Sequence, residues 1–234
     1  MTRFDKIDNV NAASQLEDIW GVLDDKERTV LAANCWVGRF RKGESVYQEG
    51  DQPDHLLCLL SGKVKIYRNG VGGRSLINRV LRPIQYFGYR AAMAGEPYVT
   101  AASAFEESLI VFVPMRTIFK LMEKNTHLCQ FFIHLLAVDL GKADQRIVSI
   151  TQKHVRGRMA ETLLGLLDVY GYDGDGQTLD LHITREDMAN LSNMTTSNAI
   201  RTLSTFANEG LIEIDGKFIK LLDVDAIQRI SDIG

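Results

Sequence analysis

The spacing of hydrophobic residues changes twice along the chain and divides it into three parts. Residues 14–33 have hydrophobic residues three and four positions apart, which predicts helix, with Asp24-Asp25 as the cap of a second helical segment. From residue 37 to about residue 114, short apolar runs alternate with glycine-containing breaks, as is typical of an antiparallel sandwich or jelly-roll barrel. The predicted strands are 45–48, 56–60, 64–67, 75–80, 101–105 and 109–113, with a hairpin connection at 69–73.

The pattern becomes helical again from residue 115 to about residue 151, and one face of this segment has a period of 3.5 residues. Its positions, three and four residues apart, are Ile133, Leu136, Leu140, Ala143, Ile147 and Ile150. This period lets two helices wrap around each other. The chain has no second helix of comparable length and apolarity, so we expect this face to join two copies as a homodimer. Burial of the helix within a single chain is the alternative.

Two short helices joined by a tight turn are predicted in the last third of the chain. Thr184 can cap the first helix, because two acidic residues follow in its first turn. Asn193 lies where the chain must turn, since Asn tolerates positive φ better than other non-glycine residues. The second helix begins near Thr195 or Thr196 and ends at Gly210. Its predicted inner face is Ala199, Leu203 and Phe206, and its predicted outer face is Thr196, Ser197, Asn198, Arg201 and Thr205. This arrangement is a helix-turn-helix, whose second helix can enter the DNA major groove.

A hairpin is predicted directly after the helix-turn-helix. Asp215-Gly216 lies between alternating apolar residues, which is the signal for a type I′ turn. The combination is a winged helix. The second helix has no acidic residue from Thr195 to Ala207, which suits a polyanionic partner, and its polar residues can bond bases or phosphates. The candidate DNA-binding residues are Arg185, Thr195, Thr196, Ser197, Asn198, Arg201 and Lys217.

Together these patterns predict an α+β chain. We expect a β-barrel domain with an N-terminal helix at residues 1–124, a long dimerisation helix at 125–152, and a C-terminal winged helix-turn-helix domain at 153–234. Composition agrees with a soluble globular protein, because the 234 residues are 45% hydrophobic and 24% charged. No run approaches the ~20 apolar residues of a membrane helix, and the first residues have no apolar signal segment.

Charge and cysteine content exclude further classes of function. The formal net charge is −3, and residues 153–234 hold eight Lys/Arg against thirteen Asp/Glu, a net charge of −5. DNA binding must therefore depend on a local arrangement of residues rather than on bulk charge. The three cysteines form no C-x-x-C pair, so we expect a cytoplasmic protein without a disulfide framework, metal site or other cofactor. The sequence contains no G-x-S-x-G, H-E-x-x-H or phosphate-binding glycine motif, so we do not expect an enzyme.

The order of these features resembles the Crp/Fnr family of bacterial transcription regulators over residues 15–222. The resemblance includes the glycine-punctuated segments of the barrel, the long helix and the hairpin after the helix-turn-helix. The barrel segments are Lys42-Gly43-Glu44, Glu49-Gly50-Asp51 and Leu60-Ser61-Gly62-Lys63-Val64. The resemblance implies a cyclic-nucleotide-binding-like barrel, a homodimer, a pseudo-palindromic DNA operator and, if the protein is an activator, contact with RNA polymerase. No membrane partner is implied.

Two departures from the family pattern concern its effectors. Cyclic-nucleotide-binding members have an acid after Phe-Gly and an arginine before Ser/Thr-Ala, whereas this chain has Phe87-Gly88-Tyr89-Arg90 and Tyr98-Val99-Thr100-Ala101. A buried phosphate without a paired cation is costly, so we do not expect cyclic AMP to bind as it does in the relatives. No cysteine cluster precedes Cys35, and no histidine spacing indicates a haem ligand. The candidate residues for an unidentified effector are Phe87, Gly88, Tyr89, Arg90, Tyr98, Thr100 and Asp144.

A second hypothesis belongs to another functional class. The protein could be a cyclic-nucleotide-type ligand-binding module whose C-terminal domain mediates protein contacts, and the net charge of −5 over residues 153–234 favours it. The two hypotheses differ in salt dependence, because DNA binding weakens steeply with salt as counterions are released.

Overall fold

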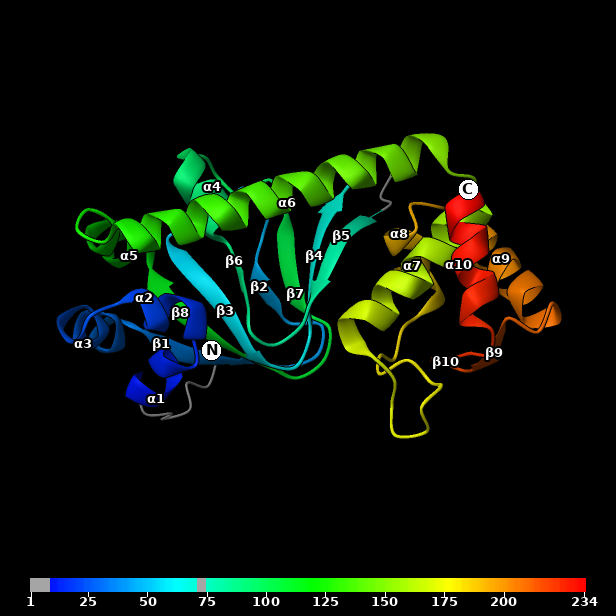
Figure 1. Ribbon diagram of the computed structural model, residues 1–234, viewed down its shortest axis with the longest axis horizontal. Coiled ribbons are helices and arrows are strands. Elements are labelled where there is room, and N and C mark those ends of the chain that lie inside the picture. The colour runs from blue at the N-terminus through cyan, green and yellow to red at the C-terminus, as the bar shows by residue number, and fades with distance from the viewer. Residues whose placement is uncertain (1–8, 71–74) are drawn as a thin grey trace. The chain divides into compact units, whose positions relative to one another are not determined.

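The computed structural model describes residues 9–70 and 75–234. The predicted hairpin connection at 69–73 lies mostly outside these residues. The chain forms two compact units, one of Met1–Asn69 with Asn78–Gly141 and the other of Gly70–Ile77 with Lys142–Gly234. Figure 1 shows the helices and strands of both. No described helix has the length and apolarity needed to cross a membrane.

Three short helices open the first unit: α1 (Asn9–Ser14), α2 (Glu17–Val22) and α3 (Asp25–Asn34). The predicted cap is confirmed, because the Asp24 carboxylate accepts a hydrogen bond from the Glu27 amide at 2.8 Å and the Glu27 side chain accepts one from the Asp24 amide at 3.0 Å. This reciprocal pair satisfies two amides that the first turn would otherwise leave without a partner.

In the described part of the first half of the chain, eight strands form two four-stranded sheets. The first has the order β1 (Trp36–Phe40), β8 (Ser108–Pro114), β3 (His55–Ser61), β6 (Gln85–Phe87). The second has the order β2 (Ser45–Tyr47), β7 (Ala101–Ala104), β4 (Val64–Asn69), β5 (Ser75–Leu81). All six predicted strands are present, and the α+β class with an antiparallel N-terminal half is confirmed. The sequence pattern missed β1, β6 and the short helix α4 (Tyr89–Ala94).

Two hydrophobic clusters of described residues stabilise the first unit. One lies between the two sheets and includes Phe40, Leu59, Phe87 and Ile110. The other joins the N-terminal helices and the β1–β8–β3–β6 sheet to α5 (Met115–Met122) and to the start of α6 (Thr126–Gln152). Leu128 and Phe132 of α6 are 0% and 1% exposed, so the first part of this long helix packs against the barrel.

The second unit contains the predicted winged helix. Its elements are α7 (Val155–Tyr170), α8 (Arg185–Leu191), α9 (Thr196–Asn208), β9 (Ile212–Asp215), β10 (Phe218–Leu221) and α10 (Val224–Ile233). The β9–β10 turn differs from the prediction. Asp215 pairs with Phe218, so Gly216 and Lys217 are the central residues, and only Gly216 has positive φ, at 55°. A glycine at the first central position is the pattern of a type II′ turn, not type I′.

Candidate nucleic-acid interface and barrel site

The first helix of the helix-turn-helix, α8, begins where the sequence predicts. The Thr184 hydroxyl accepts a hydrogen bond from the Asp187 amide at 3.0 Å, and Glu186 and Asp187 lie in the first turn. Negative side chains there interact favourably with the exposed amides of the helix start. Met188 and Ala189 are buried, at 0% and 1% exposure, so α8 packs one face against the rest of its domain.

Two arginines hold the turn between the helices. Asn193 has φ 48°, as predicted for the position where the chain must bend sharply. Arg146 of α6 donates to the carbonyl of Leu191 at 2.8 Å. Arg158 of α7 donates through Nε to the Ser192 carbonyl at 3.0 Å and through Nη2 to the Asn193 carbonyl at 3.3 Å. Cations suit the carbonyls at the end of a helix, so these contacts stabilise the turn. The sequence analysis did not identify either arginine.

The second helix, α9, begins with a cap and buries one face. The Thr195 hydroxyl accepts from the Asn198 amide at 3.2 Å. Ala199, Leu203 and Phe206 are at most 1% exposed, which confirms the predicted inner face. The exposed residues of α9 and its cap are Thr195, Thr196, Ser197, Ile200, Arg201, Ser204 and Asn208. Asn198 is half-buried beside them.

One residue expected on the outer face behaves differently. Thr205 is half-buried, and its hydroxyl donates to the Arg201 carbonyl of the same helix at 3.0 Å. A threonine hydroxyl in a helix commonly bonds its own preceding turn in this way, so Thr205 does not contribute a free group to the outer face.

The wing is connected to the start of α8. Arg185 donates through Nη2 to the Gly216 carbonyl at 3.0 Å, so this candidate DNA-binding residue holds the wing turn. Its Nη1 is buried and has no hydrogen-bond partner among the described residues. Lys217, the other central residue of the turn, is exposed. The Lys217 carbonyl accepts from the Ile183 amide at 3.1 Å, which fixes the wing against the segment before α8.

The charges of α9 and its surroundings are not all available to a ligand. Arg156 forms two bonds to the Glu209 carboxylate, at 2.8 and 2.6 Å, and its guanidinium lies 4.8 Å from the centre of the Phe206 ring. Lys220 lies 3.8 Å from Asp175. Arg201, in contrast, is exposed and forms no ion pair within the described part of the chain. The outer face of α9 therefore presents one uncommitted positive charge and several hydroxyls.

Aromatic side chains fill the barrel where effector residues were expected. Phe87, Tyr89 and Tyr98 are 0%, 1% and 6% exposed. The Tyr98 ring stacks on Tyr47 with their centroids 3.8 Å apart, and the Phe87 ring lies 6.3 Å from Tyr47. Thr100, in contrast, is only half-buried. The structure thus brings Phe87 and Tyr98 into one buried cluster with Tyr47, which sequence reasoning missed. Tyr89 packs in the other cluster, where its ring lies 5.8 Å from that of Phe132.

Gly88 is required for this aromatic packing. Its φ is +82°, and a Cβ at this position would come within 2.9 Å of the Tyr98 hydroxyl and 3.1 Å of the His55 carbonyl oxygen. Only glycine adopts this backbone conformation without strain and also leaves room for the tyrosine.

A polar network connects the barrel to α6. The Tyr89 hydroxyl donates to Asp139 Oδ2 at 2.8 Å, and Arg79 Nη1 lies 2.9 Å from Asp139 Oδ1. Burial and the negative charge of Asp139 raise the pKa of the Tyr89 hydroxyl, which therefore stays protonated and donates. Arg79 of β5 and Asp139 of α6 were not identified from the sequence, because residues 50 and 60 positions apart give no local signal.

Arg90 and Asp144, which are also effector candidates, lie outside both hydrophobic clusters. Arg90 Nη1 is 2.9 Å from Glu96 Oε1, and both side chains are about half exposed. Its charge is therefore already paired. Asp144 is exposed on α6 and belongs to the second compact unit, in its segment Lys142–Gly234.

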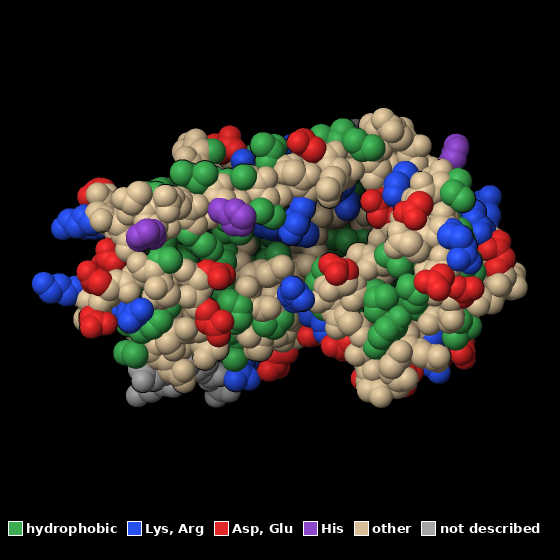
Figure 2. All heavy atoms as spheres, in the orientation of Figure 1, with side chains coloured by type: hydrophobic (Ala, Val, Ile, Leu, Met, Phe, Trp, Pro, Cys, Tyr) green, Lys and Arg blue, Asp and Glu red, His purple; other side chains and the backbone are tan. Residues whose placement is uncertain are grey.

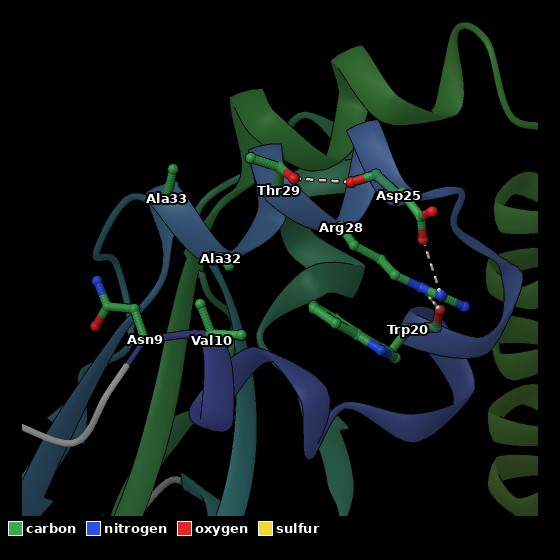
Figure 3. Close-up of a pocket in the computed structure, with 8 residues that line it drawn as sticks. All are labelled: Asn9, Val10, Trp20, Asp25, Arg28, Thr29, Ala32 and Ala33. Atoms are coloured by element: carbon green, nitrogen blue, oxygen red, sulfur yellow. Dashed lines mark hydrogen bonds and ion pairs between the residues drawn. The ribbon is translucent and has the colours of Figure 1, made fainter.

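Residues of α1, α2 and α3 line a surface pocket with a volume of about 590 Å³. Figure 3 shows these residues. Arg28 crosses the pocket: its Nε donates to the Trp20 carbonyl at 3.0 Å, its guanidinium lies 5.5 Å from the centre of the Trp20 ring, and its Nη1 is 3.4 Å from Asp25. The guanidinium of Arg28 thus already interacts with Trp20 and Asp25 of the same chain.

One face of α6 exposes large hydrophobic side chains. Ile133, Leu140 and Ile147 are seven residues apart and are 66%, 64% and 60% exposed. Figure 2 shows hydrophobic side chains along α6, at the top of the view. Residues at this spacing lie on one side of a helix, and the chain itself does not bury them.

An antiparallel barrel, a long helix and a winged helix-turn-helix define a class of two-part transcription regulators. Comparison with known proteins identifies the same two domains. The cyclic nucleotide-binding domain model matches residues 37–125, and the Crp-like helix-turn-helix domain model matches residues 157–230. The chain belongs to the Crp/Fnr family of transcription regulators.

Individual relatives span most of the chain. The CRP-like cAMP-activated global transcriptional regulator of Mycobacterium tuberculosis is 26% identical over 191 residues, which cover 81% of this chain and 85% of the relative. The fumarate and nitrate reduction regulatory protein of Escherichia coli strain K12 is 24% identical, covering 82% and 76%. A transcriptional regulator of the CRP family from Thermus thermophilus shares the fold, with a TM-score of 0.71, 23% identity and coverage of 83% and 96%.

Proposed function

We propose that this protein is a homodimeric, sequence-specific DNA-binding transcription regulator of the cytoplasm. The observation that supports it most directly is the outer face of α9, which is exposed, lacks acidic residues and presents Arg201 without an ion pair among the described residues. The surrounding domain is acidic, so a face without carboxylates suits a polyanion.

In the proposed complex, α9 enters the major groove. Arg201 bonds O6 and N7 of a guanine, and the hydroxyls of Thr195, Thr196 and Ser197 reach base edges or phosphates. Asn198 and Lys217 are further candidates for contact, and Arg185 contributes by holding the wing. The exposed hydrophobic face of α6 joins two subunits, so the operator is a pseudo-palindrome with half-sites about 34 Å apart. If the protein activates transcription, RNA polymerase is a further partner.

We further propose that cyclic AMP is not the effector. Phe87, Tyr98 and Tyr47 occupy the barrel interior with their own rings. Arg90, the only cation in the two motif segments, is paired with Glu96, so it is not free to neutralise a phosphate. An effector that acts on the barrel would have to change the packing of these rings or the contact between Tyr89 and Asp139.

The test is to select duplexes from a randomised library with the full chain and to measure their affinity by fluorescence anisotropy over a range of salt concentrations. Arg201→Ala should weaken specific binding by about 1–3 kcal/mol, roughly 5- to 150-fold. Arg229→Ala is the matched control, because Arg229 is also exposed in the same unit but lies on α10. If no duplex is enriched, or if binding is insensitive to salt, the alternative of a protein-contacting C-terminal domain is favoured.

A further inference from the structure

Ile200 is an exposed hydrophobic residue on a helix face that is otherwise polar. It lies in the second turn of α9 and is 47% exposed. Thr196, one turn before it, and Ser204, one turn after it, are also exposed. The inner face of α9 is complete without it, because Ala199 and Leu203 are almost fully buried. Ile200 is therefore not part of the domain core.

Ile200 gives the isolated domain little stability. A β-branched residue within a helix is less favourable than alanine by a few tenths of a kcal/mol, because its χ1 rotamers are restricted. Its side chain cannot form a hydrogen bond with water or with the neighbouring Ser197 and Arg201. Single exposed hydrophobic residues are common on protein surfaces, so exposure alone indicates nothing. The position is what matters here: Ile200 lies in the first half of α9, where a helix in the major groove contacts base edges.

We propose that Ile200 determines part of the DNA specificity by packing against the C5-methyl group of a thymine. This inference rests on the proposed function of α9. In the major groove, an apolar side chain has one characteristic partner on a DNA base, the methyl group of thymine. Thr196 lies one turn away on the same side of the helix, so its methyl group extends the apolar surface.

Ile200 and Arg201 contact different base positions. Successive residues of a helix are rotated by about 100°, so two adjacent side chains point to different places along the groove. The half-site therefore contains a thymine whose recognition is separable from the guanine contact of Arg201. The energetic contributions of the two side chains should be nearly additive if their base partners are not shared.

The test uses the full chain and a duplex selected from a randomised library. Each thymine of that duplex is replaced in turn by deoxyuridine, which has the same hydrogen-bonding groups but lacks the methyl. For the wild type, replacement of the contacted thymine in one half-site should weaken binding about fourfold, as expected for the loss of one buried methyl group. Replacement of this thymine in both half-sites should weaken binding roughly fifteenfold. Ile200→Ala should weaken binding to the thymine duplex and abolish this deoxyuridine effect.

Ser204→Ala is the matched control, because it changes the same exposed face one turn further on and should keep the deoxyuridine effect. Alanine is the best helix former, so neither variant should unfold α9, and circular dichroism checks this. If binding depends on Arg201 but no thymine is sensitive to deoxyuridine, the role of Ile200 is wrong and the proposed function stands. The role of Ile200 is equally wrong if Ile200→Ala keeps the full effect. If no duplex is bound at all, both proposals are overturned.

Discussion

The proposed dimer can be tested at Leu140, which lies at the centre of the exposed face of α6. We expect Leu140→Ala to weaken the dimer without unfolding the subunit. Leu140 is 64% exposed in the single chain, so most of its surface is available for burial by a partner. Complete burial of a leucine side chain contributes about 1.5–3 kcal/mol, and burial of this exposed part contributes about 1–2 kcal/mol per subunit.

A symmetric dimer contains two copies of Leu140. Truncation to alanine, which retains one methyl group, should therefore remove about 2–3 kcal/mol of association free energy. This corresponds to a dimer dissociation constant raised roughly 30- to 150-fold. Leu140→Asp should have a larger effect, because it places two like charges in an apolar interface.

Sedimentation velocity over a range of protein concentrations measures this change directly. Val138→Ala is the matched control, because Val138 is two residues away and faces the opposite side of α6. It is 38% exposed and should leave the dimer intact. Urea unfolding should show that both variants fold. The reasoning is refuted if Leu140→Ala sediments as the wild type does, or if the wild type is a monomer at every concentration.

Two further predictions concern the first unit. Gly88→Ala should lower the free energy of unfolding by about 1–3 kcal/mol more than Gly95→Ala does. Both glycines have positive φ, but only at Gly88 would a Cβ come within 2.9 Å of the Tyr98 hydroxyl. Equal losses in urea unfolding would contradict the packing described. In thiol labelling at pH 8, Cys129 should react first, because it is only half-buried whereas Cys35 and Cys58 are buried. Burial raises the pKa of the Cys58 thiol to about 12, so little reactive thiolate forms there. Labelling of Cys58 in the folded protein would be inconsistent with this barrel.

Local sequence signals predicted most of the secondary structure. The caps at Asp24, Thr184 and Thr195 were visible because a cap depends on a few adjacent residues. The inner face of α9 was visible for the same reason, since its apolar residues recur at helical spacing. The seven-residue strand β3 was found, and so was β2, which has three residues but lies between the glycine-containing breaks at Gly43 and Gly50. β6 also has three residues, too few to establish a period, and it was missed.

The turn of the wing shows how tertiary packing overrides a local signal. The Asp215-Gly216 dipeptide favours a turn centred on itself. The observed register instead places Ile212 opposite Leu221, and both are buried, at 1% and 3% exposure. If the turn were centred on Asp215-Gly216 instead, Ile212 would no longer lie opposite Leu221. Cross-strand burial therefore determined the register, and Gly216 supplied the positive φ that the turn needs.

The candidate sites could be predicted only where their residues are close in sequence. The polar outer face of α9 was found from thirteen consecutive residues. The contact of Tyr89 with Asp139 joins residues fifty positions apart, and the bonds of Arg158 to the turn carbonyls join residues more than thirty apart. No spacing rule connects such residues, because they meet only after the helices have packed.

The contact between Arg146 and the Leu191 carbonyl has a practical consequence for domain exchange. Arg146 belongs to the last third of α6, directly before Ile147 of the exposed hydrophobic face, yet its side chain supports the bend that precedes α9. A chimera that joins residues 153–234 to another regulator would lack Arg146 and its hydrogen bond to the Leu191 carbonyl. A graft that begins at Lys142, where the longer segment of the second compact unit starts, would include Arg146 and should keep the donor's operator preference.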